Sequence, residues 1–223
     1  MPGLLIVGAG PGIATAVATR FGREGMPVTL IARRDATLVD ARDRLAVAGV
    51  TEVHTVTADA ADPVQLDAAL DKASAERGAP EVLVYNAGWI RFDKPGELDR
   101  QGHLDAYAVN VLGALDVAAR LAPEMAQAGG GTILFTGGMP TPLPALVSLS
   151  LGKAALRALA EMLAAEYAAA GVHVATVTVA GAVEPGSAFD PERIAEHYWR
   201  LHTQPVEQWQ TEVLFTGETV TSS

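Results

Sequence analysis

The chain has 223 residues, 49% of them apolar and 19% charged, which is typical of one globular domain built on a single core. Phosphate backbones and anionic lipid repel its formal net charge of −10, so no nucleic acid and no membrane partner is expected, and a small molecule is the favoured ligand. The sequence contains no cysteine, which excludes disulfides, thiolate metal sites and a cysteine nucleophile, and favours a cytoplasmic location.

Short apolar runs rich in Val, Ile, Leu and Thr alternate with longer stretches of helical periodicity from the first residues onward. The apolar start lacks a basic n-region and an unbroken run of about 20 apolar residues, so we expect neither a signal peptide nor a membrane span. Runs that are apolar on both faces are typical of parallel strands covered by helices on both sides. The expected strands are 4–8, 28–32, 52–58, 81–87, 131–137 and 173–181, and the expected helices are 12–25, 35–49, 63–77, 99–128, 151–170 and 191–202.

The first expected strand runs directly into Gly8, Gly10 and Gly12, followed by Ile13 and a helix. Glycines here permit a tight turn and let backbone N–H groups approach a pyrophosphate at the positive end of that helix. An ordinary glycine-rich turn explains the motif about equally well, so the rest of the chain has to decide.

The second expected strand ends in Arg33 and Arg34, where a site for NAD often has an acid that binds the ribose 2′-hydroxyl. Two guanidinium groups can pair with a 2′-phosphate, whereas an unesterified diol gives them no charge to pair with. The pair therefore predicts NADP(H) rather than NAD(H) as cofactor. A solvated basic pair at a helix entry is the alternative.

Pro and Gly gather at 138–144 and 180–191, after the fifth and sixth expected strands. Both clusters fall at the carboxyl edge of the sheet, where open α/β sheets bind ligands. The helix that follows the first cluster carries Lys153 on its expected first turn. Lys153, Arg157 and Glu161 are spaced four residues apart, so they could simply form a solvent-exposed helix face.

The motifs "GAGPGIA" (8–14), "TADAADP" (57–63) and "VYNAG" (84–88), then Asn110 and Lys153, follow one another along the chain. This ordered set resembles the short-chain dehydrogenase/reductase family from residue 4 to about 183. The resemblance implies a Rossmann-type, doubly wound α/β fold with a central seven-stranded parallel sheet flanked by helices. Its last strand is expected at 212–215, and the whole of 1–223 is expected to form a single domain.

The same resemblance implies which residues line the cofactor site. Ala14 stands where the family usually has a third glycine, and Pro185 replaces a threonine that often contacts the cofactor. Asp59 could equally be a loop acid and Asn86 a turn former. The residues that the resemblance assigns to the cofactor are Gly8, Gly12, Ile13, Asp59, Ala60, Asn86, Ala87, Gly88, Lys153, Gly181 and Val183.

The family's catalytic set is an Asn, a Ser, a Tyr and a Lys, and the matching positions here are Asn110, Thr136, Leu149 and Lys153. Thr136 stands thirteen residues before Leu149, the usual separation, and its hydroxyl could hold a substrate carbonyl. In the family the lysine holds the nicotinamide ribose and lowers the pKa of the tyrosine, which donates a proton. Leu149 cannot donate a proton. No spacing of His, Asp and Glu indicates a metal site.

The segment 184–210 is the part that usually covers the substrate, and it contains His197, Tyr198, Trp199 and His202. Tyr198 or a histidine could replace the missing acid, but packing of an amphipathic helix explains these residues better. Apolar stripes on the helices 99–128 and 151–170 predict a homodimer or homotetramer.

The leading hypothesis is an NADP(H)-dependent oxidoreductase that acts on a carbonyl or alcohol compound through Asn110, Thr136 and Lys153. The alternative is a catalytically silent NADP(H)-binding sensor or regulatory protein, which Leu149 favours. A third, weaker hypothesis is a structural protein that has lost cofactor affinity.

Overall fold

Seven parallel strands form one sheet in the order β3-β2-β1-β4-β5-β6-β7 in the computed structural model, which describes residues 2–218. Every strand except β3 and β7 has a hydrogen-bonded neighbour on both sides. The strands are β1 (Leu4–Val7), β2 (Val28–Ala32), β3 (Val53–Thr57), β4 (Val82–Tyr85), β5 (Gly131–Gly138), β6 (Val172–Val179) and β7 (Glu212–Phe215).

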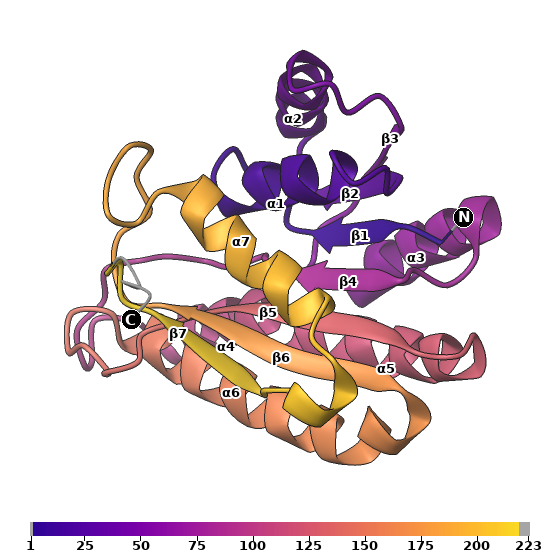
Figure 1. Ribbon diagram of the computed structural model, residues 1–223. Helices are drawn as coiled ribbons and strands as arrows, with labels where there is room; N and C mark the ends of the chain where they lie inside the picture. The colour runs from indigo at the N-terminus through magenta and orange to yellow at the C-terminus, as the bar shows by residue number, and fades with distance from the viewer. Residues whose placement is uncertain (1, 219–223) are drawn as a thin grey trace.

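Helices cover both faces of the sheet, as Figure 1 shows. Helices α1, α2 and α7 share one buried apolar cluster with the sheet, and α3, α5 and α6 share the other. The α-helices are α1 (Ile13–Gly22), α2 (Asp35–Val47), α3 (Pro63–Arg77), α4 (Arg100–Tyr107), α5 (Gly113–Gln127), α6 (Val147–Tyr167) and α7 (Pro191–His202). Short turns of other helix types lie at 108–112, 168–170 and 206–208.

The architecture confirms the predicted doubly wound parallel sheet, including the last strand at 212–215. Most predicted element ends are within three residues of the observed ones. Two helices differ in a way that matters for the site. The predicted helix 99–128 is interrupted by a π-helical turn at Ala108–Leu112, and the predicted helix 151–170 begins four residues earlier, at Val147.

The early start of α6 depends on a contact with a distant acid. Leu146 at the N-cap has no side chain that could accept from the first backbone N–H groups. The carboxylate of Asp93 does this instead, because it accepts hydrogen bonds from Ser148 N at 3.0 Å and Ser148 Oγ at 2.9 Å. Asp93 is only 1% exposed. Lys153 therefore lies on the second turn of α6, and Leu149 lies on the first.

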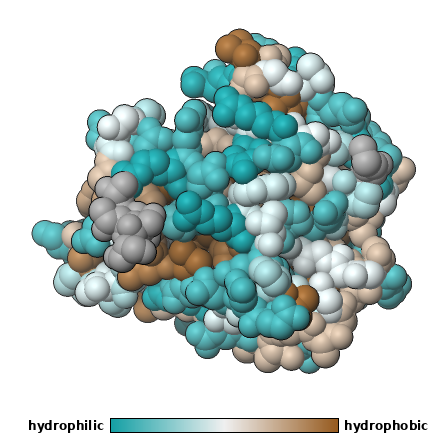
Figure 2. Space-filling model, viewed as in Figure 1, coloured by the Kyte–Doolittle hydropathy of each residue, from teal (hydrophilic) through white to brown (hydrophobic). Residues whose placement is uncertain are grey.

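Most of the face in Figure 2 is hydrophilic, with apolar atoms gathered beside the edge strand β7, where Leu214 is half-exposed. Among the described helices, none is long and apolar enough to cross a membrane.

Candidate functional site

The turn after β1 leaves open space in front of the N-terminus of α1. Gly8 has a φ of +94°, and a Cβ there would collide with the backbone of Ala87, so only glycine fits. A Cβ at Gly10 would meet no atom within 4 Å, and at Gly12 only Val183, at 4.0 Å. No side chain caps α1 at Gly12. An uncapped, positive helix end behind an open glycine turn fits a phosphate group well.

Arg33 and Arg34 follow β2 directly and are both exposed. Arg33 Nη1 lies 4.0 Å from Asp59 Oδ2, and an exposed pair at this distance adds little stability. The other carboxylate oxygen of Asp59 accepts a hydrogen bond from Ala61 N at 3.0 Å, so Asp59 also orders its own loop. Both guanidinium groups are therefore available to an anionic ligand.

Asn86 joins the ends of three strands rather than forming a simple turn. Its Nδ2 donates to Gly8 O at 2.8 Å, and its Oδ1 accepts from Thr136 Oγ1 at 2.9 Å. Thr136 Oγ1 also lies 2.6 Å from the hydroxyl of Tyr198. Because an amide oxygen only accepts, Thr136 donates its single proton to Asn86, and Tyr198 must donate to Thr136.

The Thr136 hydroxyl is therefore not free to hold a substrate carbonyl, contrary to the expectation from spacing. The side chains of Leu134 and Thr136, two residues apart on β5, point to the same face of the sheet, the face covered by α7. The position that faces Lys153 is Gly138 instead. A Cβ there would lie 3.9 Å from both Cε and Cγ of Lys153. Gly138 is the last residue of β5, and its place beside Lys153 does not follow from the spacing to Leu149.

Lys153 is buried, with 8% of its surface exposed, so it does not belong to a solvent-exposed helix face. Its Nζ donates to Thr136 O at 2.6 Å. Burial, together with the positive charge of Arg157 one turn later, lowers the pKa of Lys153 to about 8. Leu149 lies one turn before Lys153, on the same side of α6, and lines the same cavity.

Asn110 occupies the π-helical turn between α4 and α5, a feature frequent at functional sites. The Tyr85 hydroxyl donates to Val109 O at 2.6 Å and so satisfies a carbonyl of this irregular turn. Asn110 Oδ1 accepts from Trp89 N at 2.7 Å. Asn110 is 1% exposed and lies behind Gly88, so it supports the wall of the cavity without lining it.

A cavity of about 850 Å³ runs along the carboxyl edge of the sheet and brings the other predicted residues together. It is lined by Gly8, Gly10, Gly12, Ile13, Arg33, Arg34, Asp59, Ala60, Asn86, Ala87, Gly88, Thr136, Lys153, Gly181 and Val183. Leu149, at the position of the family's tyrosine, also lines it, and lining residues that the motifs did not indicate include Thr37, Trp89, Ile90, Asp105 and Met139. Several of these directly follow a motif or a strand end, so the carboxyl-edge rule could have found them.

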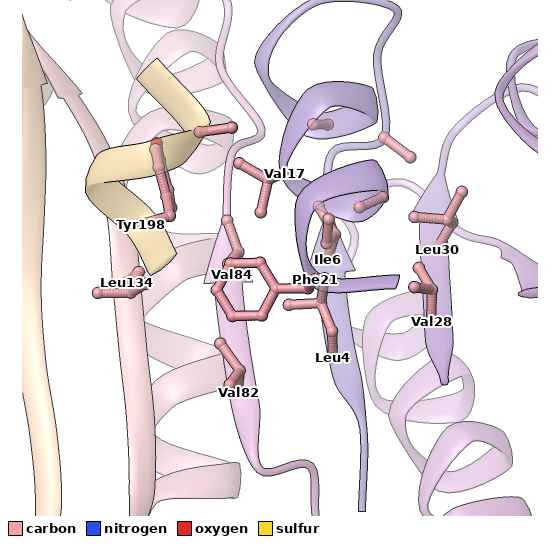
Figure 3. Close-up of a cluster of buried hydrophobic side chains, with 14 of the residues drawn as sticks. Leu4, Ile6, Val17, Phe21, Val28, Leu30, Val82, Val84, Leu134 and Tyr198 are labelled. Carbon is pink, nitrogen blue, oxygen red and sulfur yellow. The ribbon is translucent and has the colours of Figure 1, made fainter. Parts of the chain in front are cut away.

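The segment 184–210 contributes no residue to the lining of this cavity. Instead, α7 packs against α1, with the rings of Trp199 and Phe21 5.0 Å apart. Tyr198 is fully buried on the sheet-facing side of α7, in the cluster that contains Leu134 (Figure 3). Burial raises the pKa of the Tyr198 hydroxyl well above its usual value. Neither its position nor its ionisation suits a proton donor in the cavity.

Among residues 2–218, no group of three or more His, Asp or Glu side chains is arranged to hold a metal ion.

Comparisons with known proteins agree with this arrangement. The family described as short chain dehydrogenase matches residues 3–188. The oxidoreductase UcpA of Salmonella typhimurium is 33% identical over 177 residues, which cover 76% of this chain and 65% of that protein. The chain thus spans less than two thirds of the length of this curated relative.

Two solved structures share the fold over nearly the whole chain. A short-chain type dehydrogenase/reductase from Mycobacterium marinum is 25% identical, with a TM-score of 0.86 over 97% of this chain and 94% of the other. An alcohol dehydrogenase from Thermococcus sibiricus, in complex with 5-hydroxy-NADP, is 24% identical, with a TM-score of 0.84 over 96% of each chain. The family match covers most of the sequence, and the chain therefore belongs to the short-chain dehydrogenase family.

Proposed function

We propose that this protein is an NADP(H)-dependent oxidoreductase that acts on a carbonyl or alcohol compound. The observation that carries the proposal is the single cavity shared by an open glycine turn, two arginines at the end of β2 and a buried lysine. Along the sheet edge, from β2 through β1 to β5, the arginines suit the 2′-phosphate, the glycine turn suits the pyrophosphate and Lys153 suits the nicotinamide ribose of one dinucleotide. The similar alcohol dehydrogenase from Thermococcus sibiricus contains an NADP derivative, which supports the same cofactor class.

Each part of the cavity would bind a different part of the dinucleotide. The turn at Gly8–Gly12 and the N-terminus of α1 bind the pyrophosphate, and Arg33 and Arg34 bind the 2′-phosphate. Asp59 and Ala60 flank the adenine. Asn86, Ala87 and Gly88 form the wall near the nicotinamide, with Gly181 and Val183 on the other side, and Lys153 holds the ribose. The bound cofactor supplies a hydride, and the protein supplies position and a proton.

Turnover provides the test of this proposal. The unmutated protein should oxidise NADPH, and NADH more slowly, in the presence of members of a panel of small carbonyl compounds. Arg33→Ala combined with Arg34→Ala should remove the preference between the two cofactors, because it removes the two guanidinium groups that would pair with the 2′-phosphate. A preference for NADH in the unmutated protein would contradict the proposed cofactor.

A second candidate function is an NADP(H)-binding sensor without turnover. It is favoured by the apolar wall near Lys153, where Leu149 and Gly138 offer no hydroxyl. Binding of NADPH without reduction of any carbonyl in the panel would support it. In either case we propose a cytoplasmic protein.

We also propose that the chain forms a homodimer or homotetramer through the helices α4, α5 and α6. Leu104 on α4, Leu112 in the π-helical turn, Leu115 on α5 and Leu151 on α6 are 40–60% exposed, and a group of exposed leucines of this kind supports an interface.

A further inference from the structure

Among the described residues that line the cavity, Thr37 and Thr136 are the two that carry a hydroxyl, and Thr37 lies on α2, after Arg33 and Arg34. Leu149 lies one turn before Lys153 and Gly138 lies next to it, and neither has a proton to donate. The Thr136 hydroxyl donates to Asn86 and receives from Tyr198, so its proton is already committed. This chain of hydroxyls ends at an amide oxygen, which only accepts, and so it cannot deliver a proton from Tyr198 to the cavity.

The carboxylates that line the cavity are also poorly suited to donate. Asp59 lies at the end of β3 beside Arg33 and accepts from Ala61 N. Asp105 is exposed on α4, and its carboxylate accepts a hydrogen bond from Gln101 Nε2 at 2.8 Å. Both carboxylates therefore act as acceptors, which leaves the ammonium group of Lys153.

We propose that Lys153 itself donates the proton to the substrate oxygen, an inference that rests on the proposed oxidoreductase function. Nζ has three N–H bonds, and in the described part of the chain its hydrogen-bond acceptor is Thr136 O, at 2.6 Å. Two N–H bonds remain for ligand groups. Because Nζ is close to Gly88 and Cε is close to Gly138, the ammonium group lies where both walls of the cavity lack a side chain.

The step balances without any further reactant. As the hydride from the cofactor adds to the carbonyl carbon, the carbonyl π pair moves to oxygen, and oxygen takes a proton from Nζ to give the alcohol. One N–H bond of Lys153 breaks and one O–H bond forms. The resulting neutral amine regains a proton from water. The carbonyl compound is reduced by two electrons and the nicotinamide is oxidised by two.

Arg157 acts as a positioning residue for this step. Its Nη1 donates to Gly138 O at 2.8 Å and so holds the end of β5, next to Met139, whose φ is +49°. The described groups next to Lys153 other than Arg157 do not ionise: Thr136 and Gly138 lie on β5, Gly88 follows β4, and Asn110 lies in the π-helical turn. Burial, and after it the charge of Arg157, lower the pKa of Lys153 and so make its ammonium group a better acid.

Lys153 can be titrated directly in the ligand-free protein, because the chain has only three lysines and the other two, Lys72 and Lys94, are exposed. Competitive acetylation across a pH series, read by mass spectrometry, gives the midpoint of each lysine. Lys153 should titrate near pH 8, with Lys72 and Lys94 measured in the same samples as exposed references. In Arg157→Gln the midpoint of Lys153 should move up, whereas in Arg157→Lys, which keeps the charge, it should stay.

The rate of NADPH oxidation should then fall as pH rises through the midpoint of Lys153, because the neutral amine has no proton to give. In Arg157→Gln this falling limb should move up together with the midpoint. Lys153→Arg keeps a cation but cannot release its proton, so turnover should fall by about a hundred- to ten-thousandfold. The proposal would be overturned if, in Arg157→Gln, the titration midpoint of Lys153 moved but the falling part of the pH–rate profile did not. Near-normal turnover by Lys153→Arg would also overturn it.

The same experiments distinguish a failure of the proposed oxidoreductase function from a failure of the donor role of Lys153. Binding of NADPH without turnover at any pH would remove the oxidoreductase function, and the donor role with it, whatever the midpoint of Lys153. Turnover that is independent of Lys153 would leave the oxidoreductase function intact and remove the donor role alone.

Discussion

Replacing Tyr198 by phenylalanine should destabilise the protein without affecting its chemistry. The variant removes one oxygen from a fully buried ring and leaves a lone pair of Thr136 Oγ1 without its donor at 2.6 Å. A buried group left unpaired costs about 1–3 kcal/mol. For a chain of this size, each kcal/mol lowers the melting temperature by about 2–4 °C. The affinity for NADPH and the turnover should not change, because Tyr198 does not line the cavity.

The assay is urea and thermal unfolding followed by circular dichroism, next to NADPH titration and turnover. Tyr107→Phe is the matched control, since Tyr107 is 41% exposed, and the stability of this variant should stay within about 0.5 kcal/mol of the unmutated protein. If Tyr198→Phe keeps its stability but loses turnover, the tyrosine is the acid and the hydrogen-bond assignment at Thr136 is wrong.

Three further outcomes follow from the geometry. The double variant Gly138→Ser/Leu149→Tyr should raise the rate of NADPH oxidation by about a hundred- to ten-thousandfold, because it adds a phenol that can donate a proton. The serine fits, since a Cβ at Gly138 has no neighbour closer than 3.8 Å. An unchanged rate with unchanged NADPH affinity would count against the described cavity wall. Asp93→Ala should lower the free energy of unfolding by about 1–3 kcal/mol because two donors of Ser148 lose their acceptor, and a wild-type urea midpoint would refute this. The unmutated protein should sediment as a dimer or tetramer at micromolar concentration and Leu151→Glu should shift it towards monomer, whereas a monomeric unmutated protein would contradict the proposed assembly.

The layers of the fold could be predicted because they depend on local patterns. Runs that are apolar on both faces belong to strands covered on both sides, and β2, β5 and β6 follow this rule closely. The break at Ala108–Leu112 could not be predicted, because it depends on the Tyr85 hydroxyl meeting Val109 O from a strand more than twenty residues away.

The cavity could be predicted better than the groups that act in it. The carboxyl ends of parallel strands lie at one edge of the sheet regardless of side-chain conformation, so the glycine turn, Arg33 and Arg34 line one cavity, as expected. The hydrogen bonds of one hydroxyl could not be predicted in the same way. The spacing from Leu149 pointed to Thr136, but its hydroxyl is bonded to Asn86 and to Tyr198 of α7, and Gly138, the last residue of β5, lies next to Lys153. Asp93 was missed because it acts on a helix 55 residues further along the chain.

Calorimetric titration of the unmutated protein with NADPH and with NADH at the same ionic strength tests the proposed cofactor site most directly. NADPH should bind more tightly, because a guanidinium–phosphate pair contributes about 1.5–3 kcal/mol, or roughly ten- to a hundredfold in affinity. The double variant Arg33→Ala/Arg34→Ala should bind both nucleotides alike. Equal affinities in the unmutated protein would contradict the role of the two arginines, and no binding of either nucleotide would contradict the dinucleotide site itself.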